Sequence, residues 1–413
     1  MKNLTCVIVN GYLSGTSFLN EFTQAGIQCI HVSTSDELKI GVSKFKADDY
    51  VAQYSFDGNF NNLVEALKEY DPIAVVPGIQ SGVELCDRLA AALGLEQNVV
   101  ALASQRLNKY QMNLRLQETG LACAQFIASD SLSDLISWFR GKNFSKVVIK
   151  PLESLGSEGV RVCNSEADIC KFYDEIIGHK DQLGHNIDLV LLQEYLDGTE
   201  YIVNTVSKNG AHIISDVWRY NKEEIEGSIV YEKCELVDSS TAEFSSLIEY
   251  AKDVLIEFGV VFGASHCEIM LTNSGPKLVE LNPRICGAGI SELAQKSLGR
   301  GQVQLLSQLM LQQELTNTSS NGHYVLHKHA AICPLISRKE GKLLGLAHQE
   351  EIEALPAFES VSFHVNVGEV LPKTVDLFSQ PGLMFLVHED KAVLEADFAK
   401  IRELEATMYL LEA

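Results

Sequence analysis

Features that several protein classes require are scarce or missing in this sequence. Its ten cysteines are scattered from Cys6 to Cys333, with no C-x-x-C pair and no ligand spacing typical of zinc. A membrane-spanning helix needs about 18 consecutive apolar residues, and the sequence contains no such run. The N-terminal stretch has only a short apolar core, residues 7–9, before Asn10-Gly11, which is too short for a secretory signal. We therefore expect a cytoplasmic protein with reduced thiols and no structural zinc.

Basic residues are also few. The sequence has 33 Lys and Arg and 55 Asp and Glu, so that its formal net charge is −22 at pH 7. A charge of this sign repels phosphate backbones and anionic membrane surfaces. We therefore expect neither nucleic acid nor a membrane as a partner. The content of 46% hydrophobic and 21% charged residues is ordinary for a globular protein. A chain of 413 residues exceeds the usual size of one core, so we expect about two to four structural units.

Two widespread nucleotide-binding signatures are absent as well. The glycine turn at residues 11–15 does not match G-x-G-x-x-G, and no segment matches G-x-x-x-x-G-K-[ST]. The sequence therefore supports neither a dinucleotide site of the Rossmann type nor a P-loop, and we expect no NAD or flavin.

The first hundred residues alternate between strand and helix patterns. Residues 4–9 are predicted to form a buried strand, and a helical pattern separates them from a second strand at 27–32. A further strand at 73–76 is followed by a helix over 82–93. Alternation of this kind predicts a parallel sheet covered by helices, which places this part of the chain in the α/β class.

After a helix predicted over 104–119, the pattern changes to strands. These are expected at residues 146–150, 160–163, 189–194 and 201–207. Two later strands, 265–272 and 276–281, flank Asn273-Ser274-Gly275, which is typical of a hairpin turn. The polar segment 316–322 is expected to be a linker into a C-terminal unit of mixed strands and helices.

A first candidate site is the loop of small residues that follows the strand at 146–150. Lys150 leads directly into residues 151–159, which contain two glycines and two serines. Such a loop can fold its backbone N–H groups around phosphate oxygens, and a lysine at its edge supplies positive charge. The same composition also suits an ordinary turn, so this loop alone leaves both interpretations open.

A second candidate site lies on the predicted hairpin. Side chains alternate along a strand, so Glu280, Asn282 and Arg284 are expected on one face, and the partner strand can bring Glu268 beside them. Two carboxylates and a carboxamide suit Mg²⁺, which takes few protein ligands and completes its shell with nucleotide phosphates. The alternative is a pair of acids on an exposed hairpin face. The apolar residues that flank both acids count against this alternative.

The order of these segments resembles a known family. The strings PGIQSGVELCDRLAAALGL, VVIKPLESLGSEGV, LLQEYLDGTEY, HCEIML and LVELNPRICGAG follow one another along the chain. They resemble the ATP-grasp superfamily of carboxylate–amine ligases over roughly residues 1–310, and several ordered motifs are far more specific than one glycine-rich loop. Within the superfamily, the chain most resembles bacterial L-amino acid ligases that make dipeptides, including the type of the rhizocticin pathway of Bacillus.

The resemblance implies a fold and a domain order. It implies an ATP-grasp fold of the α/β (α+β) class, with a Rossmann-like parallel-sheet domain at residues 1–100. Two ATP-grasp subdomains would follow, one with the phosphate loop at 101–192 and one with the metal site at 193–315. A C-terminal α+β domain would occupy residues 316–413.

The resemblance also implies which residues bind ATP. Lys109 and Lys150 would bind the nucleotide phosphates, and Glu200 would hold the ribose hydroxyls. The flexible phosphate loop would contribute Ser154, Ser157 and Gly159. The strand that binds adenine, largely through backbone groups, would contribute Gln193, Glu194 and Leu196.

The metal ligands implied by the resemblance are Glu268, Glu280 and Asn282, which would hold Mg²⁺, or Mn²⁺ in its place. Arg284 matches the residue that neutralises the acyl phosphate or the tetrahedral oxyanion, and the backbone N–H of Gly287 would assist. Many relatives have an arginine two residues before the first metal carboxylate, whereas this chain has His266. We expect His266 to position substrate, with a structural role as the alternative.

The implied reaction begins when a substrate carboxylate attacks the γ-phosphorus of ATP and gives ADP and an acyl phosphate. An amine then attacks the acyl phosphate and releases phosphate, so that two amino acids would be joined as a dipeptide. The glycine-rich loop and an insertion at residues 220–235 would close over the site. We expect small-molecule amino-acid substrates and a homodimer. A carboxylase or ligase of purine or biotin metabolism, or a non-catalytic ATP-binding module, is the alternative.

Overall fold

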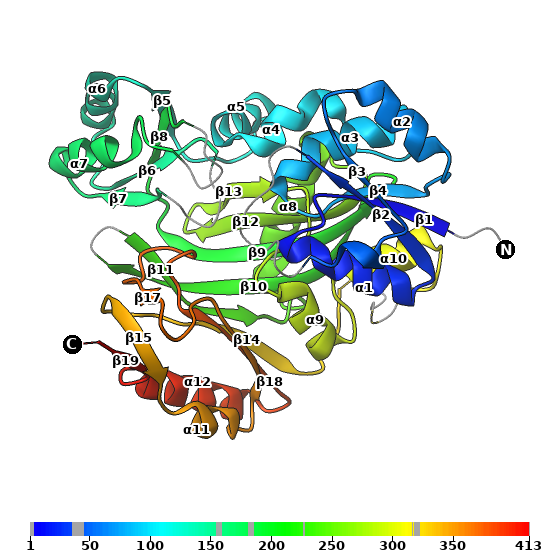
Figure 1. Ribbon diagram of the computed structural model, residues 1–413. Coiled ribbons are helices and arrows are strands. Elements are labelled where there is room, and N and C mark those ends of the chain that lie inside the picture. Colours follow the sequence, from blue (N-terminus) through cyan, green and yellow to red (C-terminus); the bar gives the residue numbers. More distant parts are fainter. Residues whose placement is uncertain are drawn as a thin grey trace.

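The computed structural model describes residues 4–34, 45–153, 159–180, 186–225, 228–315, 317 and 323–412. Within these residues the strands form four sheets, with helices packed against them (Figure 1). No helix in this described part is long and apolar enough to cross a membrane. The Ser154 and Ser157 positions of the predicted phosphate loop lie outside the described residues, as does the predicted linker except for Asn317.

The N-terminal sheet is parallel and has the order β3-β2-β1-β4, which confirms the parallel sheet predicted from the sequence. Its strands are β1 (Leu4–Val9), β2 (Ile27–Ser33), β3 (Ala52–Ser55) and β4 (Ala74–Pro77). Alternating residues of β1 face opposite sides. Val7 and Val9 pack toward α2 (Phe60–Lys68) and α3 (Val83–Ala92), whereas Cys6 and Ile8 pack toward α1 (Thr16–Gln24) and the later helix α10 (Gln302–Met310). Both faces are therefore covered, and β1 and β4 are largely apolar.

A small antiparallel sheet in the order β5-β8-β6-β7 follows in the chain. It consists of β5 (Phe126–Ser129), β6 (Val147–Pro151), β7 (Arg161–Cys163) and β8 (Val190–Glu194). The helices α6 (Leu132–Lys142) and α7 (Glu166–Ile176) share one apolar core with it, in which Leu135, Ile149 and Ile169 are fully buried. Lys150 lies near the end of β6, as the sequence predicted.

The central sheet is antiparallel throughout and has the order β13-β12-β9-β10-β11-β14-β18-β16. Its strands are β9 (Gly198–Lys208), β10 (Ala211–Ile225), β11 (Ser228–Leu236), β12 (Gly263–Thr272), β13 (Gly275–Asn282), β14 (His329–Pro334), β16 (Phe358–Phe363) and β18 (Gly382–His388). The helix α8 (Ser245–Glu257) packs against β12 and β13, and α9 (Ile290–Leu298) packs against β14 and β18.

The C-terminal strands β14, β16 and β18 belong to the same sheet as β9–β13. The helices α11 (Gln349–Glu353) and α12 (Lys391–Glu405) share a core with these strands, and a three-stranded sheet lies beside them in the order β17-β15-β19. Its strands are β15 (Gly341–Leu346), β17 (Val370–Leu371) and β19 (Tyr409–Leu411). One hydrogen-bonded sheet thus crosses the predicted boundary at residue 316, and the four-part division of the chain stays a prediction.

One detail of the predicted secondary structure was wrong. The helix expected over 104–119 is two helices, α4 (Ala103–Leu107) and α5 (Lys109–Thr119), because Asn108 between them is extended and its side chain accepts the N–H groups of Tyr110 and Gln111. Asparagine favours this capping position over a helix interior. The described residues of the expected insertion at 220–235 lie in β10 and β11 of the central sheet, and its closure over the site stays a prediction.

The buried histidine of β2 generates a prediction on stability. Burial lowers the pKa of His31 to about 4, and its Nε2 accepts a hydrogen bond from the Gly11 N–H at 3.1 Å, which requires the neutral ring. As the pH falls below about 6.5, the unfolded chain takes up a proton that the folded chain does not. Between pH 7 and pH 5, His31 should therefore lower the free energy of unfolding by about 2 kcal/mol.

Urea denaturation at the two pH values measures this loss. His31→Gln is the control, since it keeps a hydrogen-bond acceptor and does not titrate. An equal loss of stability in both proteins would show that His31 contributes nothing to the pH dependence.

Candidate active site

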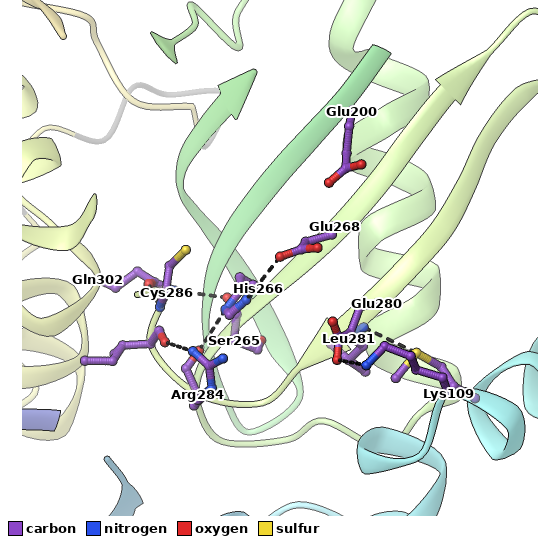
Figure 2. Close-up of polar contacts among 12 residues, drawn as sticks. Lys109, Glu200, Ser265, His266, Glu268, Glu280, Leu281, Arg284, Cys286 and Gln302 are labelled. Atoms are coloured by element: carbon purple, nitrogen blue, oxygen red, sulfur yellow. Dashed lines mark hydrogen bonds and ion pairs between the residues drawn. The ribbon is translucent and has the colours of Figure 1, made fainter. Parts of the chain in front are cut away.

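The β12–β13 hairpin brings four of the predicted site residues onto one face. Glu268 lies directly opposite Glu280, and His266 lies directly opposite Asn282. Cross-strand partners share a face, and residues two apart on a strand do so as well. On the other side of β12, Met270 lies opposite Glu200 of β9, so Glu200 is on the same face. Figure 2 shows Glu200, Glu268 and Glu280 on these strands.

Two lysines from other elements lie close to these carboxylates. Lys109 begins α5, and its Nζ lies 3.1 Å from Oε1 of Glu280 (Figure 2). Its backbone N–H donates to the Leu152 carbonyl at 3.0 Å, which joins α5 to the segment that follows β6. Lys150 is buried, and burial together with the charge of Lys109 lowers its pKa to about 8. The two lysines therefore come from α5 and β6, whereas the carboxylates come from strands of the central sheet.

The negative charges of the carboxylates on this face repel one another. Burial and the charges of Glu200 and Glu280 raise the pKa of Glu268 to about 8. A cation bound between Glu268 and Glu280 would relieve this repulsion, and Asn282 adds a further oxygen ligand. Within the described residues, no group of three or more His, Cys, Asp and Glu side chains is placed to hold a metal. Two carboxylates, a carboxamide and substrate phosphates fit Mg²⁺, which needs few protein ligands.

Arg284 lies just after the hairpin, because β13 ends at Asn282. The sequence predicted Glu280, Asn282 and Arg284 on one strand, which is wrong for Arg284. Its backbone N–H donates to the Asn282 carbonyl at 2.9 Å, and its Nη1 donates to the Ile285 carbonyl at 2.9 Å. In the part of the chain that the structure describes, the buried Nε has no hydrogen-bond partner.

His266 lies between the metal-site residues and this arginine. Its Nδ1 is 3.4 Å from the Arg284 carbonyl oxygen, and its Nε2 is 4.0 Å from Oε1 of Glu268 (Figure 2). Burial and the positive charge of Arg284 lower the pKa of His266 well below its usual value. The ring is therefore neutral, and its role in positioning substrate stays a prediction.

Gly287 lies in the loop between β13 and α9. A Cβ atom at this position would meet no atom within 4 Å, so packing does not explain the glycine. A hydrogen bond joins this loop to α10, because the Cys286 N–H donates to Oε1 of Gln302 at 2.9 Å. The role predicted for the Gly287 N–H is not tested by this geometry.

The residues assigned to adenine lie at the end of β8. Gln193 is buried, and its carboxamide donates to Asn113 at 3.2 Å. The Glu194 carboxylate accepts from Lys277 at 3.3 Å and from the Gln125 N–H at 3.0 Å. Leu196 follows the strand and is partly buried.

Of the residues predicted to bind the ribose and to form the phosphate loop, the structure describes Glu200 and Gly159. Glu200 is 5% exposed, and its Oε1 has no hydrogen-bond partner. Gly159, which ends the predicted phosphate loop, has the positive φ of 67° that favours glycine.

Sequence reasoning missed Lys222 of β10. Its Nζ lies 2.6 Å from Oε2 of Glu200. No motif marks this lysine, and only the strand register places it on the face that carries Glu200.

Comparison with known proteins agrees with this geometry. Residues 107–288 match the family model of the ATP-grasp domain. Over these residues the chain is similar to ATP-grasp domains. Along 98% of its length it is 29% identical to dapdiamide A synthase of Enterobacter agglomerans, of which 96% is covered.

Two solved structures share the fold over the whole chain. The L-amino acid ligase from Bacillus licheniformis superposes with a TM-score of 0.77 at 17% identity and with 100% of both chains covered. A carboxyaminoimidazole ribonucleotide synthase from Aspergillus clavatus gives 0.72 at 13% identity, with 99% of this chain and 100% of the other covered. The ATP-grasp fold expected from the sequence is confirmed, whereas the rhizocticin type stays a prediction.

The lowered pKa of Lys150 predicts how nucleotide binding depends on pH. Bound phosphate favours the charged lysine, so the Kd for ATP should be lowest below pH 8 and should rise by up to about tenfold per pH unit above it. Titrations of ATP binding between pH 7 and pH 9.5 measure this dependence. Lys150→Arg stays charged over this range and should remove it. A wild-type Kd that is constant across the range would contradict a phosphate contact by Lys150.

Proposed function

We propose that this enzyme joins two L-amino acids through an acyl phosphate and releases a dipeptide, ADP and phosphate. The observation that carries the proposal is the register of the β12–β13 hairpin, which sets Glu268 against Glu280 and His266 against Asn282. The similarity to dapdiamide A synthase over nearly the whole of both chains supports amide-bond formation. The fold shared with an L-amino acid ligase is consistent with this substrate class.

In this proposal, ATP lies between the small sheet and the central sheet. Lys109 and Lys150 bind its phosphates, and most of the loop expected to surround the terminal phosphate lies outside the described residues. Glu194 and Leu196 lie beside adenine, and Glu200 accepts a ribose hydroxyl. Mg²⁺, held by Glu268, Glu280 and Asn282, would neutralise phosphate charge and align the terminal phosphate for transfer.

The chain's own groups then hold the reacting atoms. The carboxylate of the first amino acid attacks the γ-phosphorus of ATP, the bond to the β-phosphate oxygen breaks, and ADP leaves. The neutral amine of the second amino acid attacks the acyl carbon and loses a proton, and phosphate leaves as the tetrahedral intermediate collapses. The unpartnered Nε–H of Arg284 and the N–H of Gly287 donate to the developing oxyanion. His266 is neutral and positions substrate beside them.

A carboxylase or ligase of purine or biotin metabolism is less well supported, because the relative that is similar over nearly the whole of both chains is dapdiamide A synthase. A binding module without catalysis would have no need of an arginine beside His266 whose buried Nε, within the described residues, has no hydrogen-bond partner. The cytoplasmic homodimer expected from the sequence stays a prediction.

The nucleotide product tests the mechanism. Incubation with ATP, Mg²⁺ and a matrix of amino-acid pairs should release ADP and phosphate in equal amounts, together with a dipeptide detected by mass. An adenylating ligase would give AMP and pyrophosphate instead. Stoichiometric AMP would overturn the acyl-phosphate route, whereas ADP formed with bicarbonate but with no amino acid would favour the carboxylase alternative.

Arg284→Lys tests the oxyanion role. Lysine keeps the positive charge but loses the planar set of donors, so kcat should fall on the order of 100-fold or more while the Kd for ATP barely changes. Arg106→Lys is a matched control, because Arg106 is fully buried and pairs with Asp87 at 2.7 Å outside the site. This control should lower the Tm and leave kcat of the folded enzyme near that of the wild type. Full kcat in Arg284→Lys would end the catalytic assignment.

A further inference from the structure

Lys222 of β10 is held beside the predicted ribose carboxylate by several independent contacts. Its Nζ lies 2.6 Å from Oε2 of Glu200. The same ammonium lies 4.4 Å from the ring centroid of Tyr231 and 5.2 Å from that of Tyr220. Contacts with a ring face stabilise a cation in addition to the ion pair. Lys222 is thus a fixed cation in the ATP-grasp site.

The strand register explains why these groups meet. Tyr220 lies opposite Glu200 in the β9–β10 ladder, and Lys222 follows two residues later on the same face. The β10–β11 ladder shifts register between Asn221 and Lys222, so that Lys222 faces Tyr231 and one residue of β11 is left over. A bulge of this kind re-aims the side chains that follow it. Here the bulge turns Tyr231 toward Lys222.

As a result, the two carboxylate oxygens of Glu200 have different surroundings. Its Oε2 is occupied by Lys222, whereas its Oε1 is buried and has no hydrogen-bond partner among the described residues. The residue is 5% exposed, so water does not readily satisfy the unpaired oxygen. Burial acts against the charged form of Lys222, but the Glu200 and Glu268 carboxylates outweigh it, and the pKa of Lys222 is raised well above its usual value. The ammonium therefore stays charged and remains paired with Oε2 of Glu200.

We propose that Lys222 is a positioning residue that holds Glu200 by its Oε2, so that the other oxygen, Oε1, is oriented to select a ribonucleotide by accepting a hydroxyl of the ribose. This inference rests on the proposed function for the ATP site and adds a residue and a specificity to it. Lys222 acts through Glu200 and needs no contact with the nucleotide. Without Lys222, the carboxylate loses the partner that orients it, and the preference for a sugar with hydroxyl groups should disappear.

The experiment compares the binding of ATP and 2′,3′-dideoxy-ATP by calorimetry, without amino-acid substrates. The wild-type protein should bind ATP on the order of tenfold more tightly, the range expected for a hydrogen bond to a charged acceptor. Lys222→Met and Glu200→Gln should each bring the ratio of the two Kd values close to one. The double variant should show no further change, because the two residues act as a unit. Lys222→Arg should restore most of the preference.

The matched control is Lys233→Met. Lys233 is a buried lysine on the opposite face of the same hairpin, paired with Glu235 at 3.0 Å and Glu395 at 2.7 Å. Its loss should lower the Tm and leave the Kd ratio at the wild-type value, which separates sugar selection from general damage to the hairpin. Lys222→Gln replaces Lys222→Met if the latter does not fold.

The outcomes separate this inference from the proposed function. A wild-type ratio in Lys222→Met or Lys222→Gln, or an equal loss of affinity for both nucleotides, would overturn the role of Lys222 and leave the ligase assignment intact. A failure to find any dipeptide product would not alter the binding ratios. Absence of ATP binding by the wild-type protein would overturn both.

Discussion

The central constraint on this molecule is that three carboxylates, one buried and two partly buried, share one face of a sheet. Glu200, Glu268 and Glu280 are brought together by the ladders of β9, β12 and β13, and burial together with the charges of Glu200 and Glu280 raises the pKa of Glu268. Like charges at this spacing are unfavourable unless cations lie among them. Lys109 from α5 and Lys222 from β10 supply such cations by direct ion pairs. The site is therefore assembled from segments far apart in the chain, because no single segment can balance its charge.

This balance also explains why the site suits a magnesium nucleotide. A polyphosphate adds negative charge, a divalent ion adds positive charge, and the surrounding lysines and glutamates can exchange partners as both enter. In the proposed function, Lys109 would exchange the Glu280 carboxylate for a phosphate once a cation lies among the carboxylates. Burial together with the charge of Lys109 lowers the pKa of Lys150, and burial together with the charges of Glu200 and Glu280 raises the pKa of Glu268, so a bound anion and a bound cation would each favour the charged form of the group beside it.

The sequence predicted those parts of the fold that depend on local pattern. The β1–β2 and β12–β13 pairs were recognisable because apolar periodicity and the turn at Asn273-Ser274-Gly275 are local signals. The break at Asn108 was missed because the helical pattern continues through it, and only the capping geometry reveals it. Lys222 was missed for a different reason. Its place beside Glu200 depends on a register shift between β10 and β11, and a bulge leaves no periodic trace in the sequence. The contacts of Lys109 with Glu280 are likewise set by tertiary packing.

The continuity of the central sheet has a consequence for motion. β14, β16 and β18 are hydrogen-bonded into the same sheet as the strands that carry Glu200, Glu268 and Glu280, so the C-terminal part cannot swing over the site without breaking a ladder. The small sheet is not part of these ladders. Ion pairs of Lys146 with Glu224 at 2.8 Å and of Lys277 with Glu194 at 3.3 Å join it to the central sheet. Side-chain contacts can exchange without breaking a backbone ladder, so we expect any opening and closing of the site to move the small sheet rather than the C-terminal strands.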